Sequence, residues 1–415
     1  MAGEPTMRPL TDLVTFERAL ALIAGLCQPI ERSERVELAA SGGRVLVDDV
    51  RAAEDAPASD RSRMDGYAVS SLELSGLKAG EGRPLKVLGR SLAGAPLARA
   101  LEVGTCAEIA TGAELPQGAD AVVPVEHTRP ASDEARVEVV GPVERYQHVL
   151  RKASDYRAGE VLVAGGQVLT PAKVAAAAAA HATTVLVRER PRVLIVPTGD
   201  EVQPLGGPLG DGRVRESNTY GLAAFIASRG GLPERHPILP DVEAELDAAL
   251  LKVAAYDAAV FTGGSSAGSK DFLAAGLARA GKVAFHGVQV RPAKPVLFGH
   301  VHGRPVLGLP GNPTSCMVGA HLFLDRVLSG LLGTAPGPIT TTRARLEGDL
   351  RALASSSPPG FLTLVLVRLE GGRAVPVLRD SMTVTGAGYA DGFVALPAGK
   401  SPPASGEDVP VVLLR

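Results

Sequence analysis

The chain has 415 residues, a formal net charge of −2, 45% hydrophobic residues and only 4% aromatic residues. This length predicts roughly two to four domains, and the lack of a basic excess disfavours a protein that binds nucleic acid. The three cysteines (Cys27, Cys106 and Cys316) lie too far apart for a metal-ligand spacing or a disulfide framework, which is typical of a reducing compartment. The apolar run 19–27 is too short to span a bilayer. We therefore expect a soluble, cytoplasmic protein without a membrane partner.

Two segments of the N-terminal half carry helix signals. Residues 12–27 place Leu13, Phe16 and Leu20 on one side of a helix. Thr170-Pro171 is a typical helix start, because the threonine hydroxyl can cap the first turn and proline fits the first helical position.

The rest of this half is predicted to consist of strands and loops. Residues 34–50 alternate in polarity around a glycine pair, which predicts short strands and a turn. Residues 57–67 are polar and irregular, as expected of a loop. Residues 84–150 are rich in Val, Gly and Pro and lack a helical period, so we expect a β-rich unit.

Apolar strands alternate with helical stretches from about residue 190 to 330, which predicts a parallel sheet with helices on both faces. The expected strands are 193–196, 258–261 and 306–309, and the expected helices include 218–229, 241–253, 271–280 and 313–332. After the Gly/Pro-rich segment 333–338 only strand patterns remain.

Three polar, glycine-rich loops, 197–201, 262–268 and 309–315, each follow a buried strand and precede a helix. Ligands of open α/β sheets bind at such strand ends, where glycines admit a ligand and helix N-termini offer N–H groups to anions. The carboxylates at these loops, Asp200, Glu201 and Asp271, are oxygen ligands that suit Mg²⁺. Two nearby cationic residues, Arg291 and Lys294, add positive charge. Together they predict a metal-assisted site for phosphates or oxyanions.

Each element also has a purely structural interpretation. Asp200 alone could cap a helix, and Gly263-Gly264 could form only a tight turn. Ser269 stands where a P-loop requires lysine, so that motif is excluded. The three loops can form one site only if they meet at one edge of the sheet.

Motifs distributed over nearly the whole chain resemble one family in their order and spacing. They are Met64-Asp65-Gly66-Tyr67-Ala68, Ala110-Thr111-Gly112-Ala113, Asp155, Thr198-Gly199-Asp200-Glu201, Glu216-Ser217-Asn218, Gly263-Gly264, Asp271, Lys294-Pro295 and Gly308-Leu309-Pro310-Gly311-Asn312-Pro313. On these motifs the chain resembles the molybdopterin molybdotransferases, the family that includes the E domain of gephyrin.

The resemblance implies a multidomain α/β and β fold with four parts. They are an elongated dimerisation segment (12–32, 51–59 and 152–185), a β-rich lobe (33–50 and 60–151), a doubly wound three-layer α/β domain that binds molybdopterin (186–338) and a C-terminal β-barrel-like domain (339–415). It also implies a homodimer whose active cleft is shared, and contacts with other proteins of molybdenum-cofactor synthesis.

The implied reaction joins molybdate to adenylyl-molybdopterin, with Mg²⁺, and releases AMP. The resemblance assigns catalytic roles to Asp65, Thr111, Asp155, Glu201, Asp241, Asp271 and Arg291. It assigns substrate binding to Thr198, Gly199, Asn218, Gly263, Gly264, Ser266, Lys294, Pro295, Pro310, Gly311, Asn312, Pro313 and Ser381. The expected magnesium ligands are Asp200, Glu201 and Asp271.

The chain departs from the family pattern at a few positions. Gly287 stands where some members have lysine, and Ala293 replaces the usual glycine before Lys294. In the last domain Phe361, Thr363 and Leu366 fall where relatives commonly carry charged residues, one of them an arginine. Loss of an arginine at an oxyanion site is not conservative.

Two other functions remain open at this point. One is molybdopterin adenylyltransferase, a family that resembles only 186–338. The other is a non-catalytic scaffold that binds molybdopterin, which the altered last domain favours. Tungstate, nearly equal to molybdate in size and charge, also remains a candidate substrate.

Overall fold

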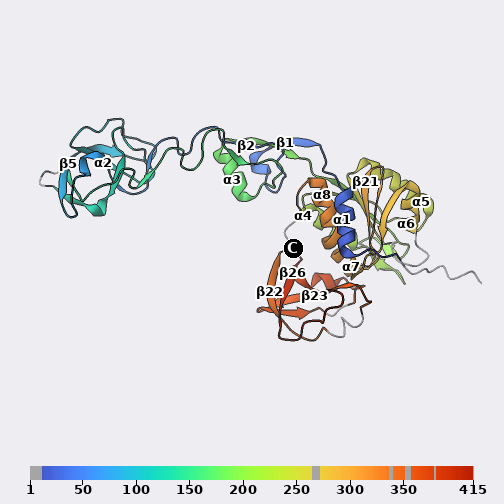
Figure 1. Ribbon diagram of the computed structural model, residues 1–415. Helices are drawn as coiled ribbons and strands as arrows, with labels where there is room; N and C mark the ends of the chain where they lie inside the picture. The colour runs from blue at the N-terminus through green and yellow to red at the C-terminus, as the bar shows by residue number, and fades with distance from the viewer. Residues whose placement is uncertain are drawn as a thin grey trace, which may run out of the picture.

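The computed structural model describes residues 12–131, 133, 135–263, 272–335, 340–350, 357–377 and 380–414. The molecule is extended (Figure 1). A β-rich lobe lies at one end and a small connecting unit in the middle, while the α/β domain lies at the other end with the C-terminal domain beside it. The expected multidomain architecture is confirmed.

The sheet of the α/β domain has the strand order β16-β13-β17-β21-β20-β18. Its parallel strands are β13 (Arg192–Pro197), β16 (Leu232–Arg235), β17 (Ala258–Thr262) and β21 (Arg304–Leu309), and an antiparallel edge adds β20 (Leu297–Val301) and β18 (Gly281–His286). On β13, Val193 and Ile195 face one core while Leu194 and Val196 face another. Both faces are therefore covered, as expected of a doubly wound sheet.

Helices cover both faces of this sheet. One face carries α1 (Phe16–Leu26), α4 (Asn218–Ser228), α7 (Pro313–Gly319), a π-helical turn (Ala320–Leu324) and α8 (Asp325–Leu332). The other face carries α5 (Glu243–Lys252) and α6 (Phe272–Ala280). These bounds match the helices that the sequence predicts to within a few residues.

Within the described residues, one helical stretch is long and apolar enough to cross a membrane. It is Pro313–Leu332, and most of its apolar part is buried inside the fold. Packing between the sheet and its neighbours therefore accounts for its apolar composition.

The connecting unit joins an outgoing and a returning pass of the chain. β1 (Ser33–Glu37) pairs antiparallel with β12 (Thr184–Arg188), and β2 (Val50–Arg51) pairs antiparallel with β11 (Val161–Val163). Helix α3 (Pro171–Ala179) packs on these strands. As predicted, Thr170 caps it through a bond from the Lys173 N–H, with proline at the first position.

Two expected domain boundaries are wrong. Residues 33–50 belong to the connecting unit rather than to the β-rich lobe, because β1 pairs with β12. Residues 12–32 contain α1, which packs on the α/β domain, where the ring of Phe16 lies 5.8 Å from that of Phe323. Local polarity patterns predict a short strand or helix, but they do not specify its partner.

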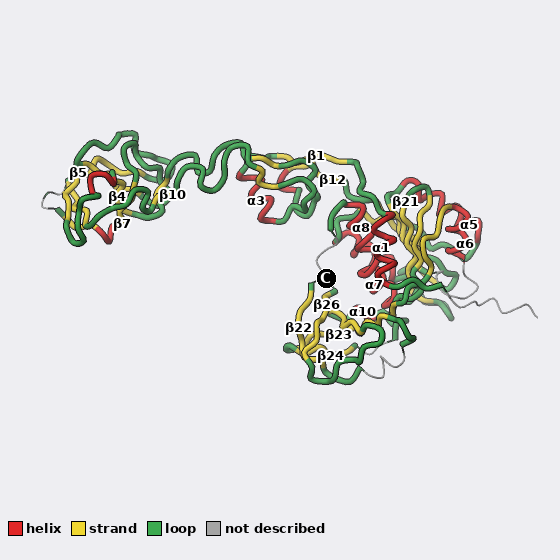
Figure 2. The backbone as a smooth tube through the Cα atoms, viewed as in Figure 1, coloured by secondary structure: helices red, strands yellow, loops and turns green. Residues whose placement is uncertain are grey.

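The β-rich lobe contains a sheet with the order β7-β4-β6-β5-β9-β8. Its elements are β4 (Gly66–Val69), β5 (Gly82–Ser91), β6 (Thr105–Ile109), β7 (Ala121–Pro124), β8 (Thr128–Pro130), β9 (Arg136–Val140) and the short helix α2 (Ser71–Leu74). β3 (Arg61–Ser62) pairs with β10 (Val149–Leu150) where the chain enters and leaves. Figure 2 shows strands and loops dominating the lobe, and the expected loop 57–67 contains β3 and the start of β4.

The C-terminal domain is a closed sheet, because β23 pairs with both β24 and β25. Its strands are β22 (Thr341–Leu346), β23 (Leu362–Glu370), β24 (Arg373–Pro376), β25 (Gly392–Leu396) and β26 (Asp408–Leu413). β19 (Val290–Arg291), which belongs to the α/β domain, pairs in parallel with β23 and so joins the two domains. The helix α10 (Thr385–Gly388) interrupts the strand-only pattern that the sequence predicts.

Candidate functional site

Three neighbouring strands of the α/β sheet end side by side, as the site hypothesis requires. The Thr198 N–H donates to the Thr262 carbonyl at 2.9 Å, and the Gly263 N–H donates to the Leu309 carbonyl at 3.2 Å. The loops that follow β13, β17 and β21 therefore begin at one edge of the sheet. Gly264, Ser266 and Asp271, expected in the second loop and just after it, lie outside the described residues.

Glycine is required at the centre of this edge. Gly263 has φ +96°, and a Cβ there would lie 2.4 Å from the Thr198 carbonyl oxygen. A Cβ on Gly311 would lie 3.4 Å from the Gly263 Cα. The first and third loops therefore approach the second closely, which brings the expected residues Thr198, Gly263 and Gly311 together.

Asn218, the first residue of α4, joins two of these loops. Its Nδ2 donates to the Thr262 hydroxyl at 2.9 Å and to the Gly311 carbonyl at 2.8 Å. The buried Glu216 fixes the helix start by accepting bonds from the N–H (2.8 Å) and hydroxyl (2.5 Å) of Thr219. Asn218 was expected to bind substrate, and the structure also gives it a role in holding the loops.

Thr262, expected at the start of the second loop but given no role there, is the last residue of β17 and contacts the other loops. Its hydroxyl accepts the Asn218 bond and lies 3.7 Å from the Cys316 sulfur. A polar side chain at the last position of a buried strand was the available signal. Cys316 is fully buried in α7.

Acidic side chains gather after β13. One Asp200 carboxylate oxygen accepts the Asp241 N–H at 3.1 Å, so Asp200 binds the backbone just before α5. Gly199 has φ +133°, and a Cβ there would lie 2.7 Å from a Glu201 carboxylate oxygen, so Glu201 folds over it. In the described part of the chain no three His, Cys, Asp or Glu side chains form a group that could hold a metal ion. Two carboxylates suffice for Mg²⁺ when phosphates supply further ligands, so the oxygen donors present fit that ion.

The cationic segment runs from Arg291 to Pro295 beside α7. Lys294 is exposed, and its carbonyl accepts the Val288 N–H at 2.9 Å. Ala293 stands where the resemblance implies a glycine; it is buried with φ +81°, a left-handed conformation that favours glycine. A Cβ on Gly319 of α7 would lie 3.6 Å from the Ala293 Cβ, so this strained residue packs against the helix.

The third loop also contacts the C-terminal domain. Asn312 precedes α7, Pro313 is its first residue, and Pro310 is buried. The Thr314 hydroxyl donates to the Thr383 carbonyl at 2.7 Å and accepts the Ala387 N–H at 3.0 Å. Ser381, expected to bind substrate, lies two residues before Thr383 in the same segment.

The altered residues of the C-terminal domain serve packing. Phe361, Thr363 and Leu366 are each at most 8% exposed. Leu366 belongs to the core shared with α1 and α8, and the Thr363 hydroxyl lies 2.6 Å from that of Ser357. Thr363 and Leu366 lie in β23, which is buried on both faces from Thr363 to Val367, and Phe361 directly precedes the strand.

The N-terminal candidates lie apart from these loops within one chain. In the β-rich lobe an Asp65 oxygen accepts the Thr111 N–H at 2.8 Å and its hydroxyl at 3.1 Å. These bonds, the backbone bond foremost, lower the pKa of Asp65 below its usual value. Asp155 is exposed in the segment that links the lobe to the connecting unit. Figure 1 shows the lobe far from the α/β domain of the same chain.

Three family models match successive parts of the chain. They are the MoeA N-terminal region (domain I and II) at 14–180, the "Probable molybdopterin binding domain" at 194–329 and the MoeA C-terminal region (domain IV) at 352–414. Together they span all four parts of the fold.

Proteins similar to the chain bear consistent names. A molybdopterin molybdenumtransferase of Bacillus subtilis is 33% identical over 399 residues, covering 92% of this chain and 90% of that protein. One of Nostoc sp. is 34% identical over 339 residues, covering 80% and 77%. A crystal structure of a molybdopterin biosynthesis MoeA protein from Pyrococcus horikoshii is 31% identical, with a TM-score of 0.80 over 97% of this chain and 100% of that one.

Proposed function

The chain belongs to the family of molybdopterin molybdenumtransferases, and from this membership we propose how its separated candidate residues act together. It is a transferase of molybdenum-cofactor synthesis. We infer that its substrates are molybdate and adenylyl-molybdopterin, and that its products are molybdenum-bound molybdopterin and AMP.

The meeting of three strand ends at Gly263 carries this proposal. The loops tied by Asn218 leave backbone at the sheet edge that a phosphorylated ligand can approach closely. Lys294 provides an exposed ammonium group for the tetrahedral molybdate anion. The dithiolene sulfurs of the pterin bind the incoming molybdenum, so the reaction requires no protein thiolate.

Mg²⁺ is proposed as the metal of this site. Asp200 and Glu201, with Asp271, would hold it, and when bound it would neutralise charge on the phosphoanhydride that links AMP to the pterin. The carboxylates after β13 support this assignment through their chemistry and position. Arg291 and Asp241 are proposed to orient the phosphates and the acidic loop.

A homodimer with a shared cleft is proposed to complete the site. Asp65, Thr111 and Asp155 would then face the α/β domain of the partner subunit and position the pterin or water. Their distance from the strand-end loops within one chain supports this arrangement, as does the Thr111–Asp65 pair, which keeps a carboxylate ionised at the lobe surface. We place the enzyme in the cytoplasm, with other proteins of cofactor synthesis as partners.

Single-turnover AMP release tests the proposal. Purified protein receives adenylyl-molybdopterin, Mg²⁺ and either molybdate or tungstate. We expect release to depend on the oxyanion and to be lost in Glu201→Gln and Asp271→Asn but retained in Glu243→Gln, which alters an exposed carboxylate of α5. Binding of the pterin without AMP release would instead establish the scaffold alternative, and pyrophosphate release from ATP would establish the adenylyltransferase.

A further inference from the structure

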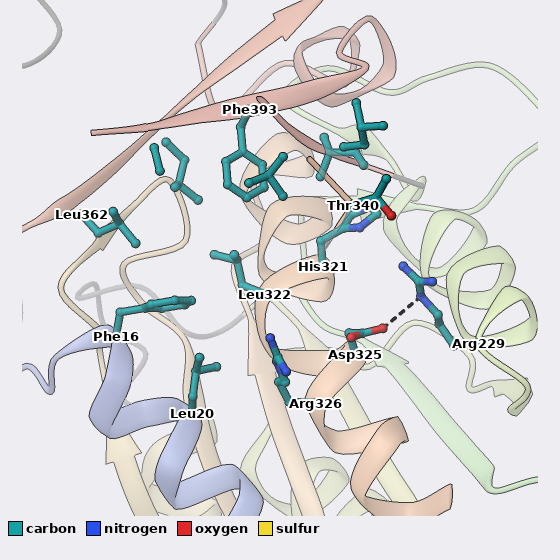
Figure 3. Close-up of a pocket in the computed structure, with 15 residues that line it drawn as sticks. Phe16, Leu20, Arg229, His321, Leu322, Asp325, Arg326, Thr340, Leu362 and Phe393 are labelled. Carbon is teal, nitrogen blue, oxygen red and sulfur yellow. Dashed lines mark ion pairs between the residues drawn. The ribbon is translucent and has the colours of Figure 1, made fainter. Parts of the chain in front are cut away.

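A cavity of about 490 Å³ lies between the C-terminal barrel and the helical face of the α/β domain (Figure 3). Its walls come from α1, from residues 321–326, and from β23, β25 and β26. No described residue that lines it belongs to the strand-end loops of the candidate site. Its volume falls within the range of about 300–1,000 Å³ typical of small-molecule pockets.

The greater part of the wall is apolar because the barrel strands have two buried faces. On β23, Val365 and Val367 point into the barrel core, whereas Leu364 lines the cavity. Phe16 and Leu20 of α1 approach from the opposite side (Figure 3). An apolar ligand would displace water from these surfaces, which is favourable in proportion to the area covered.

One end of the cavity is charged. Arg229 and Asp325 form an ion pair at 3.0 Å, and Arg326, the next residue of α8, also lines the cavity. Arg326 is half-buried, and its charge acts on the neighbouring Asp325, where it opposes the burial that raises the pKa of that carboxyl. Burial and the nearby Arg229 lower the pKa of His321 to about 4, so this imidazole is neutral at pH 7. Two arginines and one aspartate leave this end with one net positive charge.

We propose that this cavity binds a small amphiphilic carboxylate, with its head group on Arg326 and its aliphatic chain between β23, β25 and α1. A half-buried guanidinium facing apolar walls is complementary to a single anionic head with an apolar body. The ligand would contact both domains at once, and its binding would therefore stabilise their docking.

Isothermal titration calorimetry of the full chain with sodium decanoate, below its micelle concentration, tests this proposal. We expect one saturable site in the native sequence and in Arg345→Gln, a control that alters an exposed arginine of β22. Arg326→Gln should weaken binding about tenfold, since a charge-assisted hydrogen bond is lost. Decan-1-ol, which keeps the chain but lacks the charge, should bind the native protein as weakly as decanoate binds Arg326→Gln.

A second variant tests the apolar part. Ala395 of β25 lines the cavity. The variant Ala395→Phe should abolish decanoate binding, because the phenyl ring would fill the cavity. The thermal midpoint should rise with decanoate in the native protein and in Arg345→Gln, and much less in Arg326→Gln. Absence of saturable binding to the native protein, or equal affinity in Arg326→Gln, would overturn the proposal even if Ala395→Phe fails to fold.

Discussion

The side-chain amide nitrogen of Asn218 lies 2.8 Å from the carbonyl oxygen of Gly311. This bond joins the first residue of α4 to a loop that follows a different strand, 93 positions along the chain. This amide group therefore helps to hold the third strand-end loop over Gly263.

Asn218→Asp should disrupt the candidate site with little effect on the fold. A carboxylate cannot donate to the Gly311 carbonyl and would repel it, leaving a polar group unsatisfied at a cost of about 1–3 kcal/mol. We expect at least a tenfold loss of single-turnover AMP release, with an unchanged circular dichroism spectrum. Gln117→Glu, the same chemical change in the β-rich lobe, should retain activity, and full activity in Asn218→Asp would contradict the positioning role.

Gly386→Ala should separate the C-terminal domain from α7. A Cβ at residue 386 would lie 2.4 Å from the Thr314 hydroxyl oxygen, which donates to the Thr383 carbonyl and accepts the Ala387 N–H. Relief of that overlap should cost about 1–3 kcal/mol of unfolding free energy and raise the KM for molybdate. Gly388→Ala is the matched control, since nothing lies within 4 Å of its Cβ; equal stability of both variants would refute this account.

Subunit complementation should reveal whether the cleft is shared. Asp65→Asn and Lys294→Ala chains, each inactive alone, are co-expressed with different tags and purified as mixed dimers. If Asp65 of one subunit serves Lys294 of the other, one cleft of each mixed dimer carries both changes and the other carries none, so activity returns. A mixed dimer of one Lys294→Ala chain and one Asn218→Asp chain should stay impaired. Both residues belong to the same α/β domain, so each cleft would carry one of the two changes. If neither kind of mixed dimer is active, each chain uses its own Asp65.

The three cysteines should resist thiol reagents in the native protein. Burial raises the pKa of Cys27, Cys106 and Cys316 to about 12 in each case, so the reactive thiolate is scarce at pH 8. We expect negligible reaction with Ellman's reagent before unfolding and reaction of all three thiols in guanidinium. Rapid labelling of Cys316 in the folded chain would mean that α7 opens readily.

His321 should make stability depend on pH. Its folded pKa of about 4 lies below its ordinary value of 6.5, chiefly through burial and secondly through Arg229. Between these values the unfolded chain binds a proton that the folded chain does not, so the free energy of unfolding falls as pH falls through this window and stays level below it. His321→Gln should show a shallower decline in guanidinium titrations at pH 7 and pH 5. An identical decline in both proteins would assign the effect to other groups.

The sequence predicted those parts of the fold that local chemistry determines. Thr170 caps α3 and β13 alternates between two cores because caps and side-chain alternation are set by a few neighbouring residues. The strand-end loops could be placed because parallel strands share their carboxyl edge.

Partners far apart in the chain could not be predicted in the same way. The alternating polarity of residues 33–50 is compatible with any half-buried sheet and does not identify the neighbouring strand. The structure shows that β1 pairs with β12. Thr314 gave no sign of its bond to Thr383, because the two lie in separate domains. Leu366, read from the family pattern as a lost charge, is instead part of a core that includes α1.

The position of α1 has a consequence for how the protein is made. This helix packs on α8, which begins about 300 residues after α1 ends. At typical synthesis rates of about 5–20 residues per second, its apolar face waits roughly 15–60 s for its partner to leave the ribosome. During that interval the outgoing and returning strands of the connecting unit can already pair, so the lobe end of the nascent chain can become ordered while the apolar face of α1 is still exposed.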